Sequence, residues 1–141
     1  RMKSILWVLG AFFLVGCQTK TSAVSSMSPT EAAGMLRNGF AVVVDVREEA
    51  EIKQTGMAQG ARWIPLAKIQ TDAPEWRALL AEVKKDQKLA FYCAAGRRAQ
   101  VAAEKAAAAG FSAANLGGFS DWKNAGLPVA KDIPGSAAVQ R

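Results

Sequence analysis

Apolar and polar residues follow one another along this chain in blocks of two kinds. Short apolar runs rich in branched residues, such as Phe40 to Val44, have the length of a buried strand. Longer segments repeat apolar residues every three or four positions, as between Trp76 and Val83, which is typical of an amphipathic helix. The pattern predicts strands at residues 40–44, 62–64, 89–92 and 113–116. It predicts helices at residues 29–37, 48–54, 74–83, 99–109 and 120–124.

Capping and turn residues mark the ends of these elements. Residues 28–31, Ser-Pro-Thr-Glu, have the form of a capping box with proline at the first helical position. Gly39 and Gly110 end two of the predicted helices, and residues 56–61 are expected to form a loop. Because strands and helices alternate, we predict a single α/β domain. It has a small, mainly parallel open sheet with helices on both faces.

The first residues have the features of a targeting signal. Lys3 precedes an apolar stretch at residues 5–15, which is shorter than the ~20 residues of a membrane-spanning helix. The stretch ends in Leu-Val-Gly-Cys at residues 14–17, which resembles the lipobox of bacterial lipoproteins. An ordinary secretory signal with a chance cysteine is the alternative. We expect a signal peptide at 1–17, a flexible tether at 18–27, a domain at 28–130 and a polar tail at 131–141.

The resemblance to lipoproteins implies a lipid on Cys17 and a place in the cell envelope. Gln18 follows that cysteine where lipoproteins retained at the inner membrane carry aspartate. The resemblance therefore favours the periplasmic face of the outer membrane. With Cys17 lipidated, Cys93 is the one thiol that remains, so no intrachain disulfide is expected.

Composition narrows the chemistry further. The sequence has no histidine, which excludes a histidine base and histidine metal ligands. A lone cysteine cannot build a zinc site, and we expect neither a metal nor a cofactor. The net charge is +6, but basic residues are scattered among acidic ones except at Lys84, Lys85 and Lys88. We interpret that cluster as a solvated loop, so no nucleic-acid partner is expected. The oligomeric state stays open, with a monomer favoured.

The segment after the third predicted strand carries the candidate chemistry. Cys93 ends the strand and is followed by a loop of small residues and arginines: Ala94, Ala95, Gly96, Arg97 and Arg98. Backbone N–H groups converge at such a helix N-terminus, where they stabilise a thiolate and bind anions. Asp45 and Arg47 end another predicted strand. Sites in open α/β sheets form at the carboxyl ends of strands, so we expect both groups at one edge.

With these motifs in order, the chain resembles a single-domain rhodanese, a member of the sulfurtransferase family. The segments that carry the resemblance are residues 44–48, 60–65, 92–99, 116–122 and 126–129. Together they cover nearly the whole of the predicted domain. The family usually has a Gly-His pair before its Gly-Ala, whereas this chain has Gly56-Met57 in that region. The missing histidine affects the expected local packing more than the expected chemistry.

The resemblance implies two nucleophilic steps at Cys93. The thiolate takes sulfur from a small anionic donor such as thiosulfate, and a thiol or cyanide then removes it from the persulfide. Residues 94–98 are implied to bind the anion, with Arg98 orienting the loop or the donor. Asp45 and Arg47 are implied to brace the loop, and a purely structural ion pair is the favoured alternative for both.

Other functions stay open at this stage. Many rhodanese-like domains bind or regulate without turnover, although these typically lack the cysteine that is present here. Related cysteine-dependent phosphatases and arsenate reductases have a loop one residue wider, whereas four residues separate Cys93 from Arg98 here. Thiol–disulfide exchange would lack a resolving cysteine. The sequence therefore favours a sulfurtransferase, with a binding module as the first alternative.

Overall fold

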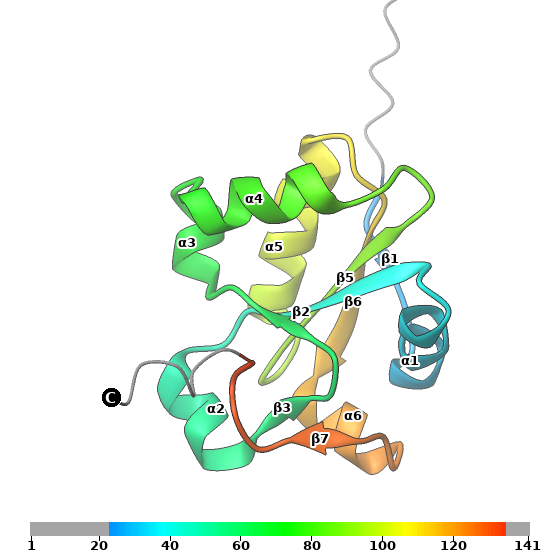
Figure 1. Cartoon of the computed structure of the whole chain (residues 1–141), viewed down its shortest axis with the longest axis vertical. Coiled ribbons are helices and arrows are strands. Elements are labelled where there is room, and N and C mark those ends of the chain that lie inside the picture. Colours follow the sequence, from blue (N-terminus) through cyan, green and yellow to red (C-terminus); the bar gives the residue numbers. More distant parts are fainter. Residues whose placement is uncertain (1–22, 135–141) are drawn as a thin grey trace, which may run out of the picture.

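A parallel sheet forms the centre of the molecule (Figure 1). The computed structural model describes residues 23–134. The strands of the sheet lie in the order β1–β6–β5–β2–β4, and every neighbouring pair is parallel. Their bounds are β1 Ser25–Ser26, β2 Ala41–Asp45, β4 Arg62–Trp63, β5 Lys88–Cys93 and β6 Ala113–Gly118. A separate antiparallel pair joins β3 Met57–Ala58 to β7 Val129–Ala130.

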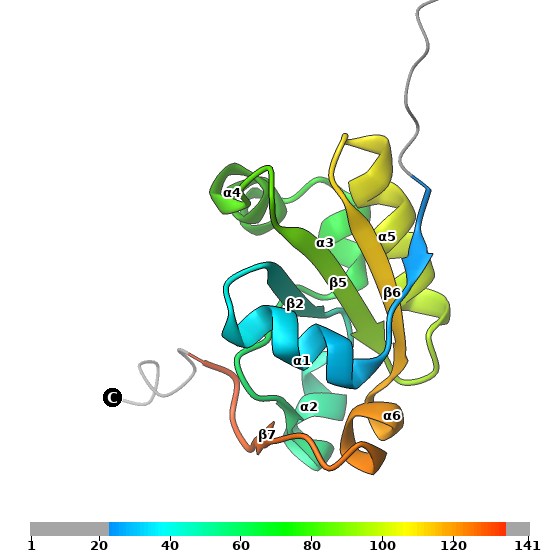
Figure 2. The same ribbon diagram turned by 90° about the vertical axis from the view of Figure 1, so that its right-hand side faces the viewer.

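Helices cover both faces of this sheet (Figures 1 and 2). Within residues 23–134 they are α1 Pro29–Arg37, α2 Glu49–Thr55, α3 Leu66–Gln70, α4 Pro74–Glu82, α5 Arg97–Ala108 and α6 Phe119–Asn124. Helices α3, α4 and α5 pack on one face, while α1, α2 and α6 contribute to the core on the other. The predicted class, a mainly parallel sheet with helices on both faces, is confirmed.

The alternation of side chains along β5 divides the core into two layers. Phe91 and Cys93 face α5, whereas Ala90 and Tyr92 face the layer of α1 and α6, because successive residues of a strand point to opposite faces. Helix α5 packs through residues with almost no side-chain volume, and these are fully buried: Ala99, Ala102, Ala103 and Ala106. The small residues let α5 approach the sheet closely, with its first turn next to the end of β5.

Two segments differ from the predicted elements. The expected loop at 56–61 contains β3, and the unassigned residues after Pro65 form α3. Both elements are short, and β3 exists because Met57 and Ala58 pair with Ala130 and Val129 from the far end of the domain. Periodicity along the chain cannot indicate a strand that depends on so distant a partner.

The predicted tether also ends earlier than expected. Ser25 and Ser26 form β1 at the edge of the sheet, and the Met27 N–H donates to the Asn115 carbonyl at 3.1 Å. Met27 is buried in the second core layer. The interpretation of residues 18–27 as flexible was therefore wrong for its last residues, where a buried methionine outweighs the polar serines.

Several predictions concern residues outside the described range. The predicted signal peptide with Cys17, residues 18–22 and residues 135–141 all lie there. At the start of the predicted tail, Ile133 packs against the second core layer. Between residues 23 and 134, no helix has the length and apolar character needed to cross a membrane.

Candidate active site

Cys93 lies at the carboxyl end of β5, beneath the loop that leads into α5. Its side chain is buried, with only 1% of the residue exposed. The Gly96 N–H donates to Cys93 Sγ at 3.0 Å. Gly96 is the N-cap of α5, so the sulfur lies at the positive end of a twelve-residue helix. Within the predicted anion-binding loop, residues 94–98, the Gly96 N–H thus donates directly to the sulfur.

Glycines allow this loop to lie close to the end of β6. Gly96 has a φ of 91°, and a Cβ on it would approach Gly117 Cα to 3.3 Å. A Cβ on Gly118 would approach the Ala94 carbonyl oxygen to 2.5 Å, which no side chain can tolerate. Gly118 is therefore needed because the Cys93 loop passes directly over it, whereas Gly117 has a φ of 83° that favours glycine.

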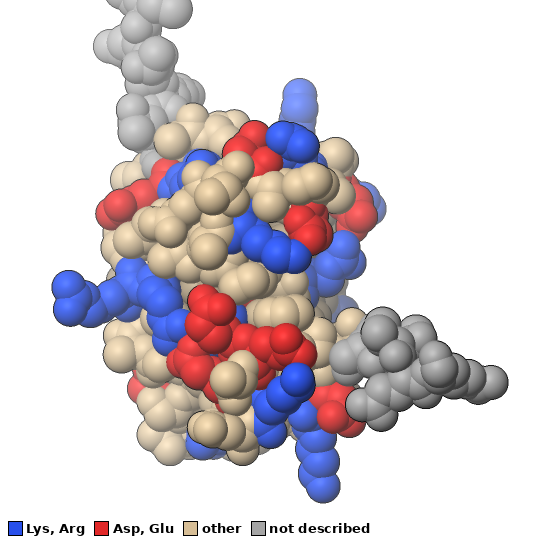
Figure 3. Space-filling view, turned by 90° about the vertical axis from the view of Figure 1, so that its left-hand side faces the viewer, with Lys and Arg blue, Asp and Glu red and all other residues tan. Residues whose placement is uncertain are grey.

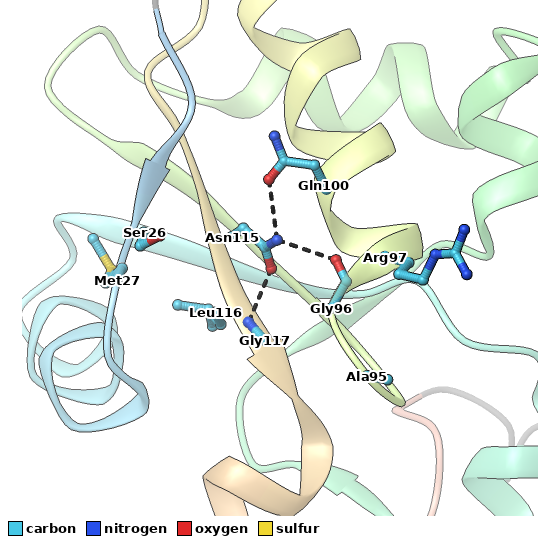
Figure 4. Close-up of a pocket in the computed structure, with 9 residues that line it drawn as sticks. All are labelled: Ser26, Met27, Ala95, Gly96, Arg97, Gln100, Asn115, Leu116 and Gly117. Atoms are coloured by element: carbon cyan, nitrogen blue, oxygen red, sulfur yellow. Dashed lines mark hydrogen bonds between the residues drawn. The ribbon is translucent and has the colours of Figure 1, made fainter.

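Asn115 fixes the loop from the side of β6 (Figure 4). Its Nδ2 donates to the Gly96 carbonyl and to Gln100 Oε1, each at 3.1 Å, and its Oδ1 accepts from the Gly117 N–H at 2.9 Å. The same residues line a pocket of about 500 Å³ beside the loop. The sequence analysis did not identify Asn115, because its partners in α5 are separated from it by an entire helix.

Arg98 is held by a carboxylate from another helix. Its Nη1 and Nη2 donate to Glu51 Oε2 and Oε1, both at 2.7 Å, and both side chains are about one-third exposed. The hydrogen bond from Arg98 lowers the pKa of Glu51 to about 2. The hydrogen bond to Glu51 in turn raises the pKa of Arg98, and the nearby Cys93 adds to this effect. Arg98 therefore stays charged between Glu51 and the sulfur.

Glu51 is a site residue that the sequence analysis missed. Its Oε2 also accepts from the Glu48 N–H at 2.9 Å, so it caps α2 while it holds Arg98. The spacing of Glu48 and Glu51 at the start of a predicted helix is a capping signal, and it could have marked Glu51 as anchored. Nothing in the local pattern connects it with Arg98, which lies 47 residues further along the chain.

The two adjacent arginines have different surroundings. Both lie in the first turn of α5, which begins two residues before the predicted start because Gly96, rather than a polar side chain, occupies the N-cap. Arg97 is exposed and forms no ion pair or hydrogen bond through its side chain with any residue between 23 and 134. Figure 4 shows it pointing away from the pocket. Arg97 is therefore a cation beside the loop whose charge no acidic side chain between residues 23 and 134 pairs with.

Acidic residues also lie near the loop, at the start of the helix whose Glu51 pairs with Arg98. Glu49 and Glu51 lie in the first turn of α2, and Glu48 precedes them. Figure 3 shows acidic side chains gathered near the middle of the face that includes α2, with basic side chains beside them. The charge around the loop is therefore mixed rather than uniformly positive.

Asp45 and Arg47 form a buried ion pair. Arg47 Nη2 donates to Asp45 Oδ2 at 2.7 Å, and the two residues are 2% and 0% exposed. Arg47 also donates to the Gly56 carbonyl at 2.8 Å and lies over the Phe119 ring at 4.2 Å. Burial alone would lower the Arg47 pKa, but the hydrogen bond and charge of Asp45, together with Tyr92, outweigh burial and raise the pKa.

This pair lies below the loop rather than in it. Among residues 23–134, neither Asp45 nor Arg47 bonds through its side chain to residues 94–98; their partners lie in β2, α2 and the turn after α2. The arrangement agrees with the structural alternative that the sequence analysis favoured for both. Arg47 Cζ lies 5.6 Å from the centroid of the Tyr92 ring, and Tyr92 is the residue before Cys93.

A comparison with known families now identifies the fold. The pattern of the rhodanese-like domain matches residues 28–125. The chain belongs to the rhodanese-like family. Met57 stands in the region where we noted the missing Gly-His pair, and it is fully buried in β3. An apolar side chain thus packs this part of the rhodanese fold.

Individual relatives are similar along most of their length. The chain is 28% identical over 113 residues to mouse thiosulfate sulfurtransferase/rhodanese-like domain-containing protein 3, covering 74% of this chain and 72% of the mouse protein. A Rhodopseudomonas palustris protein of unknown function, described as a possible tyrosine phosphatase, aligns with a TM-score of 0.63 and 28% identity over 76% of this chain and 85% of its own. The human single-domain sulfurtransferase TSTD1 aligns with a TM-score of 0.58 and 25% identity over 72% and 97%. Rhodanese-like domains generally act on sulfur donors and thiophilic acceptors.

Proposed function

We propose that this protein is a sulfurtransferase that carries sulfane sulfur on Cys93. The observation that supports the proposal is the 3.0 Å hydrogen bond from the Gly96 N–H to Cys93 Sγ at the start of α5. This arrangement favours an anionic sulfur, both in the thiolate and in a persulfide. No general base is needed, because the thiolate itself is the nucleophile.

In the first step, the Cys93 thiolate attacks the outer sulfur of thiosulfate. A new S–S bond forms to Cys93 while the S–S bond of thiosulfate breaks, and sulfite leaves with the electron pair. The terminal sulfur of the persulfide carries the negative charge. Arg97 attracts the anionic donor to the loop, since its charge is not neutralised by a partner within the described residues.

In the second step, a thiophilic acceptor removes the terminal sulfur. Cyanide attacks that sulfur, the bond to Cys93 breaks, and thiocyanate leaves while the thiolate returns. A thiol acceptor reacts in the same way and becomes a persulfide. Arg98 remains paired with Glu51 beside the sulfur and offsets its negative charge in both states.

Phosphate chemistry is the alternative that the R. palustris neighbour raises. A phosphatase of this type needs an arginine whose two nitrogens clamp the phosphate. Both donors of Arg98 are instead engaged by Glu51 at 2.7 Å, and the loop has only four residues between Cys93 and Arg98. These contacts favour sulfur transfer over phosphate-ester or arsenate chemistry.

A binding or regulatory role without turnover is the second alternative, because many rhodanese-like domains are non-catalytic. The intact loop supports catalysis: Cys93 is present, and its backbone donor is in place.

We also propose that the protein works at the cell envelope. The support is the sequence alone, with its apolar segment followed by Cys17 in a lipobox-like context. A lipid on Cys17 would place the domain on the periplasmic face of a membrane, with the outer membrane favoured by Gln18.

The deciding experiment is mass spectrometry of the purified protein after incubation with excess thiosulfate. We expect a gain of one sulfur atom, about 32 Da, that disappears on addition of cyanide or dithiothreitol. The Cys93→Ser variant must show no gain. Hydrolysis of an aryl phosphate should stay at the level of that variant.

Either part of the result can contradict the proposal. If the folded protein has a Cys93 that reacts with iodoacetamide but takes up no sulfur, the thiosulfate reaction is wrong. Another sulfur donor, or a binding role without turnover, would then be the better hypothesis. Phosphatase activity that depends on Cys93 would favour the alternative chemistry.

A further inference from the structure

The end of the sheet opposite the Cys93 loop carries a second distinctive surface. All strands of the sheet run in parallel, so their starts gather at one end and the Cys93 loop lies at the other. Ser25 at the start of β1 pairs with Ala114 near the start of β6. Figure 2 shows the beginning of β1 at the same end as the turn between α4 and β5. The chain therefore enters the fold at the end remote from the candidate active site.

This end combines basic residues with an exposed aromatic ring. We call it the basic face, and it consists of Arg37, Phe40, Lys84, Lys85 and Lys88. Phe40 is 51% exposed, the largest exposure of any large hydrophobic residue in the described chain. Asp86 is the acidic residue within the α4–β5 turn, so positive charge predominates.

Hydrogen bonds hold the parts of the basic face together. Gln87 Nε2 donates to the Gly39 carbonyl at 2.9 Å, which links the α4–β5 turn to the α1–β2 turn. The Lys88 N–H donates to the Phe40 carbonyl at 2.9 Å. Lys88 Nζ donates to Ser25 Oγ at 3.4 Å, so the lysines also adjoin the start of β1. The face is a fixed surface rather than three independent loops.

An aromatic side chain surrounded by lysines is typical of a surface that rests on a membrane. The ring enters the boundary between headgroups and acyl chains, and the ammonium groups contact anionic headgroups. Each lysine or arginine near an anionic leaflet adds to the attraction. In water alone, the same arrangement leaves Phe40 exposed without benefit.

The number of residues between Cys17 and the fold limits how far the domain can lie from a membrane that holds a lipid on Cys17. Six Cα–Cα steps separate Cys17 from Ala23, the first described residue. Even fully extended, six residues span only about 20 Å. Ser25, at the start of β1, lies eight steps from Cys17, so a lipid on Cys17 would keep the start of β1, and with it the basic face, within about 30 Å of the bilayer.

We propose that the basic face docks on an anionic phospholipid surface and turns the Cys93 loop away from the membrane. The docked orientation leaves the loop open to donors and acceptors in the surrounding compartment. This inference does not depend on sulfur transfer, because none of its residues belongs to the candidate active site. It depends on the predicted lipid anchor.

The test compares two vesicles that hold the same lipidated full-length protein. One consists of phosphatidylcholine, and the other contains about one-third phosphatidylglycerol. The anchor attaches the protein to both, so any difference reports docking of the domain. Hydrogen–deuterium exchange is measured at residues 37–41 and 83–88, with residues 94–97 as the internal reference.

We expect the amides of residues 37–41 and 83–88 to exchange about tenfold more slowly on the anionic vesicles. The difference should vanish in high salt, where the Debye length falls to about 3 Å. Residues 94–97 should exchange equally on both vesicles. The variant Lys84→Glu/Lys85→Glu should lose the protection, whereas the control Lys53→Glu/Lys131→Glu should keep it. Phe40→Ser tests the ring separately and should reduce the protection, and an unchanged melting temperature verifies that each variant is folded.

Three results would overturn the proposal. Equal exchange on the two vesicles would show that anionic lipid does not bind this face. Protection that increases with protein density on both vesicles would show that a second copy covers it. Absence of lipid on Cys17 in the purified protein would remove the tether on which the argument depends. Loss of sulfur uptake with intact protection would concern only the proposed function.

Discussion

Cys93 is supported by a main-chain donor, with the Arg98 guanidinium nearby, and not by a histidine base. The sequence has no histidine, and the direct contact of the sulfur is the Gly96 N–H at 3.0 Å. A site of this kind depends on the shape of the backbone, and small changes in the loop matter more than changes in surface charge. Gly96 is the residue at which this dependence is most easily measured, since its φ is 91°.

Gly96→Ala should reduce sulfur uptake by at least about tenfold, because the substitution strains the backbone by about 1–2 kcal/mol and displaces the donor. Its Cβ would also meet Gly117 Cα at 3.3 Å. Gly110→Ala is the matched control, with the same φ of 91° but nothing within 4 Å of the added atom. Urea unfolding and sulfur uptake are measured on both. Equal losses of uptake in the two variants would contradict the role of the loop.

The ion pair of Arg98 and Glu51 joins two helices, α5 and α2, that the sequence treats as separate elements. The pair holds the first turn of α5 beside the sulfur while Glu51 also caps α2. The coupling has a consequence for acid stability. The pKa of Glu51 is lowered from 4.5 to about 2, so the stabilisation is complete above pH 4.5 and is lost as the pH falls toward 2.

Glu51→Gln should therefore lower the melting temperature at neutral pH and bring it closer to that of the wild type below pH 4.5. The partner of Arg98 is then neutral at every pH. Glu49→Gln is the control, since Glu49 forms only an exposed ion pair with Lys53 at 2.8 Å. Melting curves from neutral pH down to about pH 2 provide the measurement. A gap between wild type and Glu51→Gln that does not change with pH would contradict the assignment.

Local signals predicted the elements that depend on local interactions. The helix at 29–37 was predicted correctly because its capping contact involves only residues that are close in the sequence. Ser28 Oγ accepts from the Glu31 N–H, three residues further along, at 3.2 Å. The position of Cys93 at the end of a strand was likewise predicted from the apolar run before it. Glu51 and Asn115 escaped prediction because their partners lie in α5, and only the folded sheet brings these elements together.

At the scale of the whole molecule, the edge strand β1 belongs to the fold and not to a linker. It completes the sheet beside β6, and Met27 fills the second core layer. Without β1, the edge of β6 would be open to pairing with other chains. The stability of the domain thus depends on residues that precede the segment matched by the rhodanese-like family.

A chain that starts at Ser28 should lose about 2–4 kcal/mol of unfolding free energy relative to one that starts at Ala23, chiefly because Met27 is no longer buried. It should also aggregate more readily. Removal of residues 135–141, which lie outside the described range, is the matched control and should leave stability unchanged within about 0.5 kcal/mol. Urea titration checks both. If the chains that start at residues 23 and 28 are equally stable, β1 does not contribute to the stability of the fold and the prediction is wrong.

In the proposed reaction, the depth of Cys93 limits which molecules can exchange sulfur with it. With 1% of the residue exposed, Sγ is closed to a bulky reagent, so the proposed reaction requires a small donor. Once loaded, the reactive atom is the outer sulfur, which projects about 2 Å further. A large acceptor, even the thiol of another protein, can then collect a sulfur atom although it never touches Cys93. The loop would thus restrict the sulfur donor to small molecules, while the acceptor that removes the sulfur could be larger.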